Sequence, residues 1–170
     1  MNAGAMQRAL TRMAHEIVEA NESGNDVVLI GIQRGGVSVA QRLAKIVSDI
    51  WKNPLPTGTL DVGMHRDDLA AHAAPPMHPT VIPFDVADKT VILIDDVLFS
   101  GRTTRAALDA LNDFGRPKKI QLAVLVDRGH RELPIKADFV GKNVPTALTE
   151  KVNVRFKEDD QVDEVVIEKP

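Results

Sequence analysis

The sequence predicts an α/β protein whose core is a parallel sheet with helices on both faces. Three apolar runs, at residues 27–32, 91–94 and 120–126, are typical of strands that are buried on both sides. Segments with helical periodicity alternate with these runs, which is the pattern that produces parallel βαβ units. Because each run ends in a polar loop, the carboxyl edge of this sheet is where we expect a ligand.

The composition is that of an ordinary globular protein. With 170 residues, 44% of them hydrophobic, the chain can bury a sizeable core, and we expect a single domain over residues 1–170. Cysteine is absent, which excludes disulfides and thiol catalysis and favours a cytoplasmic location. No apolar run approaches the roughly 20 residues of a membrane span, so we expect no membrane partner. A formal net charge of −3 argues against indiscriminate binding of polyanions.

The first expected element is an amphipathic helix from about Ala5 to Ala20, within an N-terminal segment of residues 1–22. The residues with helical spacing that should face the core are Met6, Leu10, Met13 and Ile17. The opposite face carries Arg8, Thr11, Arg12 and His15. That face is either an ordinary solvated surface or a surface that contacts a polyanion.

The apolar run at 27–32 leads directly into the polar turn Gln33–Gly36, and an amphipathic helix through Ile50 follows. An arginine between a strand end and two glycines, beside backbone N–H groups, suits an anion. A two-glycine turn alone is a weak signal. It becomes strong here because a second anion loop follows later in the chain.

A loop with few core anchors separates the first strand unit from the second. We expect a strand at residues 60–65 and a mobile loop within 60–80 that closes over the site. Arg66 lies in this loop, and prolines and alanines follow it. We expect His72 and His78 to be solvated and not metal ligands, because no acid or cysteine cluster completes a metal site there.

The stretch Val91–Thr104 carries the strongest functional signal. Its apolar strand ends on two adjacent carboxylates, Asp95 and Asp96, and a loop of hydroxyl, glycine and arginine residues follows. Backbone N–H groups at a helix N-terminus favour an anion, so residues 100–104 should hold a phosphate. The carboxylates suit sugar hydroxyls or a bridged cation. A ligand with a phosphate at one end and a diol at the other fits this order.

The remaining elements complete the sheet and cover its edge. A helix is expected at 105–114, ended by Gly115, and the run at 120–126 ends in a third polar loop that begins at Asp127. Within residues 127–170, short strands and an acidic turn should form a small C-terminal cap. We expect these strands at 137–141, 151–156 and 165–167, and the acidic turn at 158–160.

The Val91–Thr104 stretch resembles the phosphoribosyl-pyrophosphate (PRPP) fingerprint of type I phosphoribosyltransferases, and the Gln33–Gly36 turn is similar to their pyrophosphate loop. Nearly the whole chain resembles the PyrR family of pyrimidine-operon regulators. The matching segments are Gln121–Pro134, which is the most specific, and Ala9–Glu16, Arg66–Leu69, Gly115–Pro117 and Ala137–Thr146.

This resemblance implies the type I phosphoribosyltransferase fold and a uracil phosphoribosyltransferase that makes UMP and diphosphate from uracil and PRPP with Mg²⁺. It also implies transcription attenuation of pyrimidine genes through UMP- or UTP-responsive binding of the mRNA leader. We expect the chain to form a homodimer or homotetramer.

The family's motifs assign roles to individual residues of this sequence. The PRPP ribose and phosphate would be bound by Asp95, Asp96, Val97, Leu98, Phe99, Ser100, Gly101, Arg102, Thr103 and Thr104. Pyrophosphate would be bound by Arg34, Gly35 and Arg128, and Arg66 would come down with the mobile loop. The uracil pocket would include Val152 and Lys136, although Lys136 could equally face RNA. The RNA face would include Thr11, Arg12, His15, His130, Arg131 and Lys142. Mg²⁺ would be held mostly by substrate oxygens near Asp95 and Asp96, without a dedicated protein cage.

The sequence departs from the family pattern in the alanine- and proline-rich mobile loop and at two further places. Gln33–Gly36 has a glutamine where threonine is more common and contains a second glycine, and His65 replaces a frequent tyrosine. Neither change removes an anion donor. Two alternatives stay open: a salvage phosphoribosyltransferase for another base with no RNA role, and a non-catalytic RNA-binding regulator that senses nucleotides.

Overall fold

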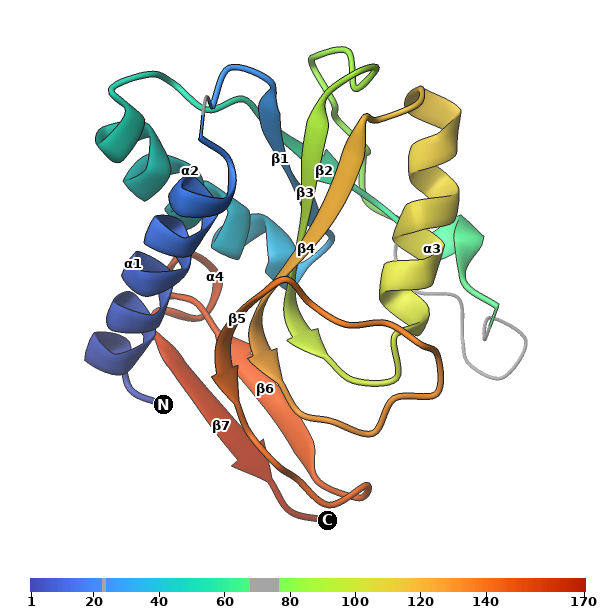
Figure 1. The fold of residues 1–170 in the computed structure, drawn as a ribbon. Helices are drawn as coiled ribbons and strands as arrows, with labels where there is room; N and C mark the ends of the chain where they lie inside the picture. Colours follow the sequence, from blue (N-terminus) through green and yellow to red (C-terminus); the bar gives the residue numbers. More distant parts are fainter. Residues whose placement is uncertain (23, 68–76) are drawn as a thin grey trace.

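The computed structural model describes residues 1–22, 24–67 and 77–170, and a five-stranded parallel sheet forms its centre (Figure 1). In spatial order the strands are β2 (Thr57–Leu60), β1 (Val27–Ile32), β3 (Thr90–Leu98), β4 (Lys119–Asp127) and β5 (Phe139–Asn143). Each neighbouring pair is parallel, so all five strands end at one edge of the sheet. The predicted α/β fold with a parallel core is confirmed.

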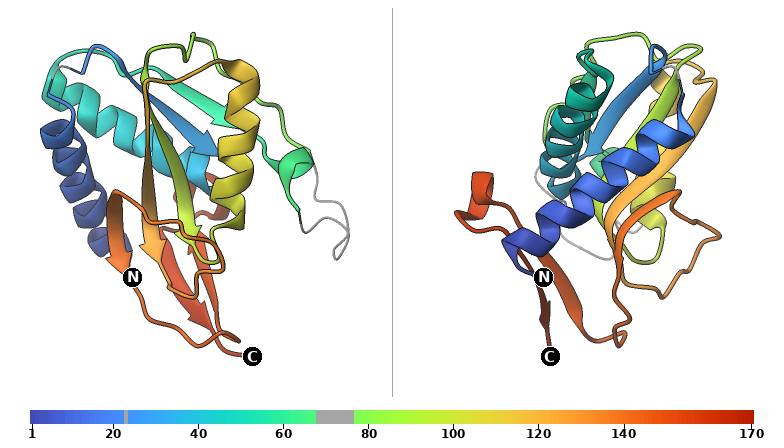
Figure 2. Two further views of the ribbon diagram at one scale, coloured as in Figure 1. Left: turned by 45° about the vertical axis from the view of Figure 1, so that its right-hand side comes forward. Right: turned by 60° about the vertical axis from the view of Figure 1, so that its left-hand side comes forward.

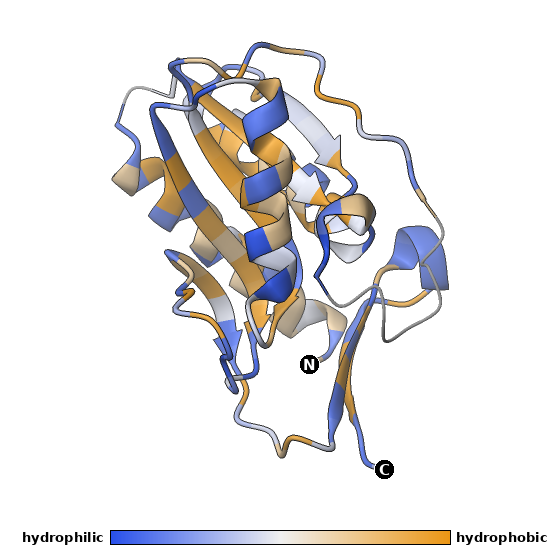
Figure 3. Ribbon diagram, turned by 90° about the vertical axis from the view of Figure 1, so that its right-hand side faces the viewer, coloured by the Kyte–Doolittle hydropathy of each residue, from blue (hydrophilic) through white to orange (hydrophobic). Residues whose placement is uncertain are grey.

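Helices cover both faces of the sheet, as the alternation of the sequence predicts (Figure 2). α1 (Ala3–Ala20) and α2 (Gly35–Trp51) pack on one face, and α3 (Arg102–Leu111) packs on the other. The four apolar residues expected on the inner side of α1 are fully buried. Figure 3 looks onto α3 and shows the hydrophobic strands behind it.

The end of the chain forms an antiparallel hairpin of β6 (Lys151–Arg155) and β7 (Glu164–Glu168), with the one-turn helix α4 (Lys157–Asp160) between them. This hairpin forms the small C-terminal cap that the sequence predicts, and Figure 1 shows it beside the carboxyl ends of the central strands. The strand expected at 137–141 is not part of the cap, because β5 pairs with β4 in the central sheet. Arg42 of α2 fastens it to the body of the protein. The Arg42 guanidinium donates to Glu158 at 2.9 and 2.5 Å and to Asp163 at 2.6 Å.

The segment after β2 differs from the prediction of a strand at 60–65. The strand ends at Leu60, because Asp61 accepts a hydrogen bond from the backbone N–H of Gly63 at 2.7 Å and turns the chain into the 3₁₀ helix η1 (Gly63–His65). Part of the loop expected to be mobile, including His72, lies at residues 68–76, outside the described residues. Arg66 lies within the described part.

The helix after β3 also begins earlier than predicted. α3 starts at Arg102, directly after Gly101, and not at Arg105. Its expected last turn is a separate 3₁₀ helix, η3 (Asn112–Phe114). The earlier start places the first turn of α3 within the predicted phosphate loop. The acidic turn expected at 158–160 is part of α4.

Candidate active site

A polar cavity of about 380 Å³ opens at the carboxyl edge of the sheet. It is lined by residues from the end of β1, the segment after β2, the end of β3 and the first turn of α3. The predicted site residues that it brings together are Arg34, Gly35, Arg66, Asp95, Asp96, Val97 and Thr103. Segments far apart in sequence thus meet where the parallel strands end, as expected for a ligand site in this class of sheet.

Asp95 and Asp96 lie at the end of β3 and face this cavity. Asp95 is only 7% exposed, and its Oδ1 accepts the backbone N–H of Asp96 at 3.0 Å. Asp96 accepts the backbone N–H of Val97 at 2.8 Å. Burial and the neighbouring Asp96 raise the pKa of Asp95 well above its usual range, and burial also raises the pKa of Asp96. This pair therefore favours a ligand that donates hydrogen bonds or carries positive charge.

The turn after β1 packs directly against the acidic pair. A Cβ atom on Gly35 would lie 2.1 Å from Oδ2 of Asp96, and one on Gly36 would lie 2.2 Å from the carbonyl oxygen of Ile94. Both positions therefore need glycine, which gives the second glycine of this turn a structural reason. The close approach places Arg34 at the wall of the cavity, within the same site as the carboxylates.

The loop after β3 turns sharply into α3 and presents the first turn of the helix to the cavity. Gly101 has a φ of +93°, which side chains with a Cβ rarely adopt. Ser100 Oγ accepts the backbone N–H of Arg102 at 3.4 Å, and Thr103 lines the cavity. Thr104 is 3% exposed, and its Oγ1 has no hydrogen-bond partner among the described residues. Together with the N-terminal N–H groups of α3, these hydroxyls can hold an anion.

Two side chains of the predicted PRPP stretch point away from the cavity. Leu98 is 2% exposed and belongs to the core on the α3 side of the sheet. The Arg102 guanidinium donates to Glu132 at 2.7 Å and to Asp67 at 2.8 Å. In this arrangement Arg102 can meet a phosphate through its backbone N–H and not through its side chain.

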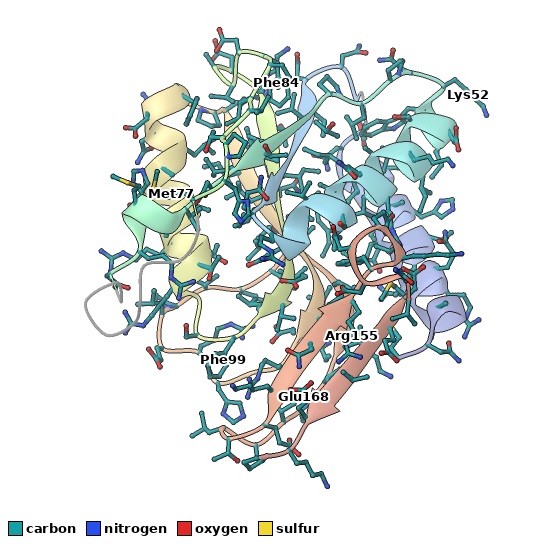
Figure 4. The ribbon with its side chains drawn as sticks, turned by 180° about the vertical axis from the view of Figure 1, so that it is seen from behind. Lys52, Met77, Phe84, Phe99, Arg155 and Glu168 are labelled. Carbon is teal, nitrogen blue, oxygen red and sulfur yellow. The ribbon has the colours of Figure 1, made fainter. Side chains whose placement is uncertain are left out.

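Arg128, the predicted third pyrophosphate ligand, is not among the residues that line the cavity. Its guanidinium carbon lies 4.1 Å from the centre of the Phe99 ring, and the side chain donates to Thr146 Oγ1 at 3.0 Å and to the carbonyl oxygen of Ala147 at 2.9 Å. Figure 4 labels Phe99 beyond the end of the central sheet. Arg128 is 6% exposed and joins the phosphate loop to the loop after β5. Arg128 has a supporting role in this arrangement, and its direct contact with pyrophosphate stays a prediction.

Arg131, a predicted RNA contact, is also engaged within the protein. It donates to the carbonyl oxygens of Phe99 at 2.8 Å and of Ile135 at 3.0 Å and pairs with the carboxylate of Asp127. His130, next to it, is exposed, and its Nε2 lies 2.5 Å from the carbonyl oxygen of Thr146. Of these two candidates, only His130 faces solvent.

The other residues expected on an RNA face lie on α1 and β5. Arg12 donates to the carbonyl oxygens of Val140 and Gly141 of β5 at 3.0 and 2.5 Å, so α1 runs alongside this edge strand. His15 and Lys142 are exposed, and Thr11 is half-buried. The structure thus brings the predicted residues of α1 close to β5, although Arg12 also pairs with Glu16 at 2.5 Å and is not an unengaged cation.

The two candidates for a base pocket are not brought together. Val152 of β6 is half-buried and packs against the same core as Val97, which lines the cavity. Lys136 is exposed in the connection between β4 and β5 and does not line the cavity. Neither residue lines the cavity, and Val152 shares a core with one residue that does.

Asp61 and His78 are among the residues of the cavity wall that sequence reasoning missed. Asp61 binds the backbone N–H groups of Gly63 and His78 and so closes the base of the loop. His78, expected to be solvated, is half-buried, and its Nε2 is buried without a hydrogen-bond partner among the described residues. A sequence signal for Asp61 exists in hindsight, because an aspartate followed two residues later by glycine favours a local turn.

Within residues 1–22, 24–67 and 77–170, no three His, Asp or Glu side chains are grouped so that they could hold a metal ion. In the same residues, no helix has the length and apolar character to cross a membrane.

Comparison with known proteins gives a consistent result. The model of the phosphoribosyl transferase domain family matches residues 2–161. A bifunctional protein PyrR of Chloroflexus aurantiacus is 57% identical over 98% of this chain and 92% of its own length, and one of Latilactobacillus sakei is 54% identical over 96% and 93%.

Solved structures show the same fold at low sequence identity. The hypoxanthine phosphoribosyltransferase of Trypanosoma cruzi matches with a TM-score of 0.76 at 16% identity and covers 100% of this chain and 95% of its own. A hypoxanthine-guanine phosphoribosyltransferase of Bacillus anthracis matches with a TM-score of 0.69 at 19% identity over 85% and 83%.

Proposed function

Because this chain belongs to the PyrR family, we propose that its polar cavity binds PRPP and uracil and is where UMP and diphosphate form. Membership makes the protein bifunctional: it is a uracil phosphoribosyltransferase and a regulator of pyrimidine biosynthesis genes. The observation that carries the assignment of the site is the Asp95–Asp96 pair, of which Asp95 is buried and Asp96 half-buried. It lines one cavity with Arg34, Arg66 and the first turn of α3.

The proposed binding mode follows the polarity of the cavity. The 5′-phosphate lies against the N–H groups and hydroxyls of residues 100–104, and the ribose hydroxyls donate to Asp95 and Asp96. The diphosphate lies toward Arg34 and Arg66, whose charges offset its own. Uracil enters from the side of Val97 and Val152. This order places C1 of the ribose between the diphosphate and the base, which is what the displacement requires.

The protein's own groups contribute binding, orientation and charge to this reaction. N1 of uracil displaces diphosphate from C1 of PRPP through a transition state that resembles an oxocarbenium ion. Arg34 and Arg66 stabilise the charge that builds on the leaving diphosphate, and the enclosed cavity orients both substrates. No activated nucleophile of the protein is needed for this displacement.

Magnesium fits the donor set as a partner of the substrate. Two adjacent carboxylates of raised pKa favour a nearby cation, and oxygen is the ligand that Mg²⁺ prefers. We propose that Mg²⁺ binds mainly through PRPP oxygens and water beside Asp95 and Asp96, where it supplies positive charge to the leaving diphosphate.

We propose that the regulatory partner is the leader of pyrimidine-operon mRNA, and that the protein binds it in the cytoplasm. The surface that supports this proposal is the strip formed by His15 of α1, Lys142 of β5 and His130, which are all exposed. Arg12 of α1 donates hydrogen bonds to β5 and so holds these two elements together.

The experiment that tests this function measures product formation with PRPP and Mg²⁺ and either uracil or hypoxanthine. We expect UMP from uracil and no product from hypoxanthine. Binding of a structured pyrimidine-leader RNA, measured with and without UMP, tests the regulatory role. Use of hypoxanthine instead of uracil, with no RNA binding, would replace this proposal with a salvage enzyme for another base.

A further inference from the structure

The segment that carries Arg66 is fastened to α3 by an ion-pair cluster outside the cavity. Oδ2 of Asp67 accepts hydrogen bonds from Nη1 of Arg102 at 2.8 Å and from Nη1 of Arg105 at 3.1 Å. Both arginines belong to the first turn of α3, whose N-terminus faces the proposed phosphate position. One carboxylate therefore ties this segment to the helix that the PRPP phosphate meets.

The side chain of Arg66, the residue before Asp67, extends toward the cavity. Its side chain lines the cavity, and its Nη1 donates to Oγ1 of Thr103 at 3.3 Å. The backbone of Arg66 is extended, with φ of −76° and ψ of 135°, which is close to polyproline II geometry, and successive side chains of such a chain point in different directions. Asp67 can thus hold the segment from outside while Arg66 reaches toward Asp95.

We propose that Asp67 is a positioning residue that holds the Arg66 guanidinium in the PRPP cavity by anchoring it through Arg102 and Arg105. This inference rests on the function proposed above. The side chains of Asp67 and Arg102 are 36% and 35% exposed, so each contact is a surface ion pair, which changes an equilibrium by about two- to fivefold and weakens with salt. The effect falls on PRPP affinity, because a guanidinium already in position has less freedom to lose when PRPP binds.

An opposite role for Asp67 makes an opposite prediction. If Asp67 only drew Arg102 away from the phosphate, its removal would release a guanidinium to PRPP and the affinity would rise. Glu132, however, holds Arg102 at 2.7 Å independently of Asp67. In an Asp67→Asn variant, Arg102 therefore stays paired with Glu132. The change that remains is that Asp67 no longer anchors the segment of Arg66 to α3.

The test compares wild type, Asp67→Asn, Asp67→Glu and Asp109→Asn. Asp109 is the matched control, because it also pairs with Arg105, at 3.8 Å, but lies one turn further along α3. At about 50 mM salt we expect Asp67→Asn to raise the KM for PRPP about two- to fivefold, with kcat and the KM for uracil unchanged. Asp67→Glu should restore part of the loss. At about 300 mM salt the gap between wild type and Asp67→Asn should narrow.

Three results would overturn the proposal. The first is an unchanged or lower KM for PRPP in Asp67→Asn. The second is an equal rise in the KM for uracil, which would indicate general loosening of the site. The third is an equal effect of Asp109→Asn. If wild type makes no UMP at all, the proposed function fails by itself, and the same variants are then compared by the dissociation constant of PRPP in calorimetry.

Discussion

The carboxyl ends of β3 and β4 lie next to each other at the same edge of the sheet, yet the carboxylates there have opposite environments. Near the end of β3, Asp95 is buried with a raised pKa and faces a cavity. The loop after β4 satisfies Asp127 with Arg131 and with the backbone N–H of Gly129 at 2.9 Å. A carboxylate that forms an ion pair within its own loop supports structure, whereas a buried carboxyl group that has a raised pKa and faces a cavity indicates a ligand site.

The largest effect should come from the carboxylates near the end of β3. Replacing Asp95 and Asp96 together by Asn removes two charge-assisted acceptors of roughly 1.5–3 kcal/mol each. We expect UMP synthesis to fall by about 100-fold or more while the circular dichroism spectrum stays that of wild type. Wild-type activity in the double variant would show that the acidic pair does not bind the substrate.

A substitution in the loop after β4 should also impair UMP synthesis, but indirectly. Arg131→Gln removes hydrogen bonds to the carbonyl oxygens of Phe99 and Ile135 and the pair with Asp127. We expect the free energy of unfolding to fall by about 2–3 kcal/mol in urea titrations. The KM for PRPP should rise more than the KM for uracil, because Phe99 belongs to the loop that meets the phosphate.

Arg116→Gln is the control for this change, since Arg116 is an exposed arginine near the opposite end of β4. It should leave both measurements at the wild-type value. If Arg131→Gln instead abolishes RNA binding and leaves stability and the KM for PRPP unchanged, then Arg131 belongs to the RNA face and not to the support of the phosphate loop.

Asp95, near the end of β3, and Asp127, the last residue of β4, should affect stability with opposite sign. A carboxyl group whose pKa is raised by folding destabilises the folded state as pH rises from its ordinary pKa, near 4, through the raised value. Asp95→Asn should therefore raise the melting temperature at pH 7, without PRPP or Mg²⁺, by about 2–4 °C for each kcal/mol relieved. This gain should vanish near pH 3, where the carboxyl group is protonated in both states.

Asp127→Asn should lower the melting temperature at pH 7, because it breaks a satisfied pair with Arg131. Calorimetric scans of both variants at pH 3 and pH 7 make the comparison. Shifts of the same sign at pH 7 would show that the two loops do not differ in the way proposed.

Much of the fold could be predicted because its signals are local. Buried parallel strands are continuous apolar runs, and the strands at 27–32, 91–94 and 120–126 lie within β1, β3 and β4. The errors arose where a side chain competes with the backbone. Asp61 accepts a hydrogen bond from the N–H of Gly63 and so ends β2. The hydrophobic periodicity of the sequence does not indicate this hydrogen bond.

The site was predictable in its residue types but not in the direction of its side chains. Sequence order placed Arg34 and Asp95 at strand ends, and parallel topology brings strand ends together. The same reasoning placed Arg128 and Arg131 there, yet both donate to backbone carbonyl oxygens of neighbouring loops. Those acceptors lie far away in sequence, at Ala147 and Phe99, so only the folded structure reveals them.

The smallest expected effect concerns the RNA face, where the engagement of Arg131 leaves the exposed residues beside it as candidates. Lys142 is exposed on β5 next to Gly141, whose carbonyl oxygen binds Arg12 of α1. Lys142→Gln removes one cation without removing packing, so it should reduce the slope of log K against log salt by about 0.7–0.9 if Lys142 meets one phosphate. Lys118→Gln, an equal charge change on an exposed residue near the start of β4, should leave the slope unchanged. Binding of pyrimidine-leader RNA over a salt series measures both, and equal slopes for the two variants would remove Lys142 from the interface.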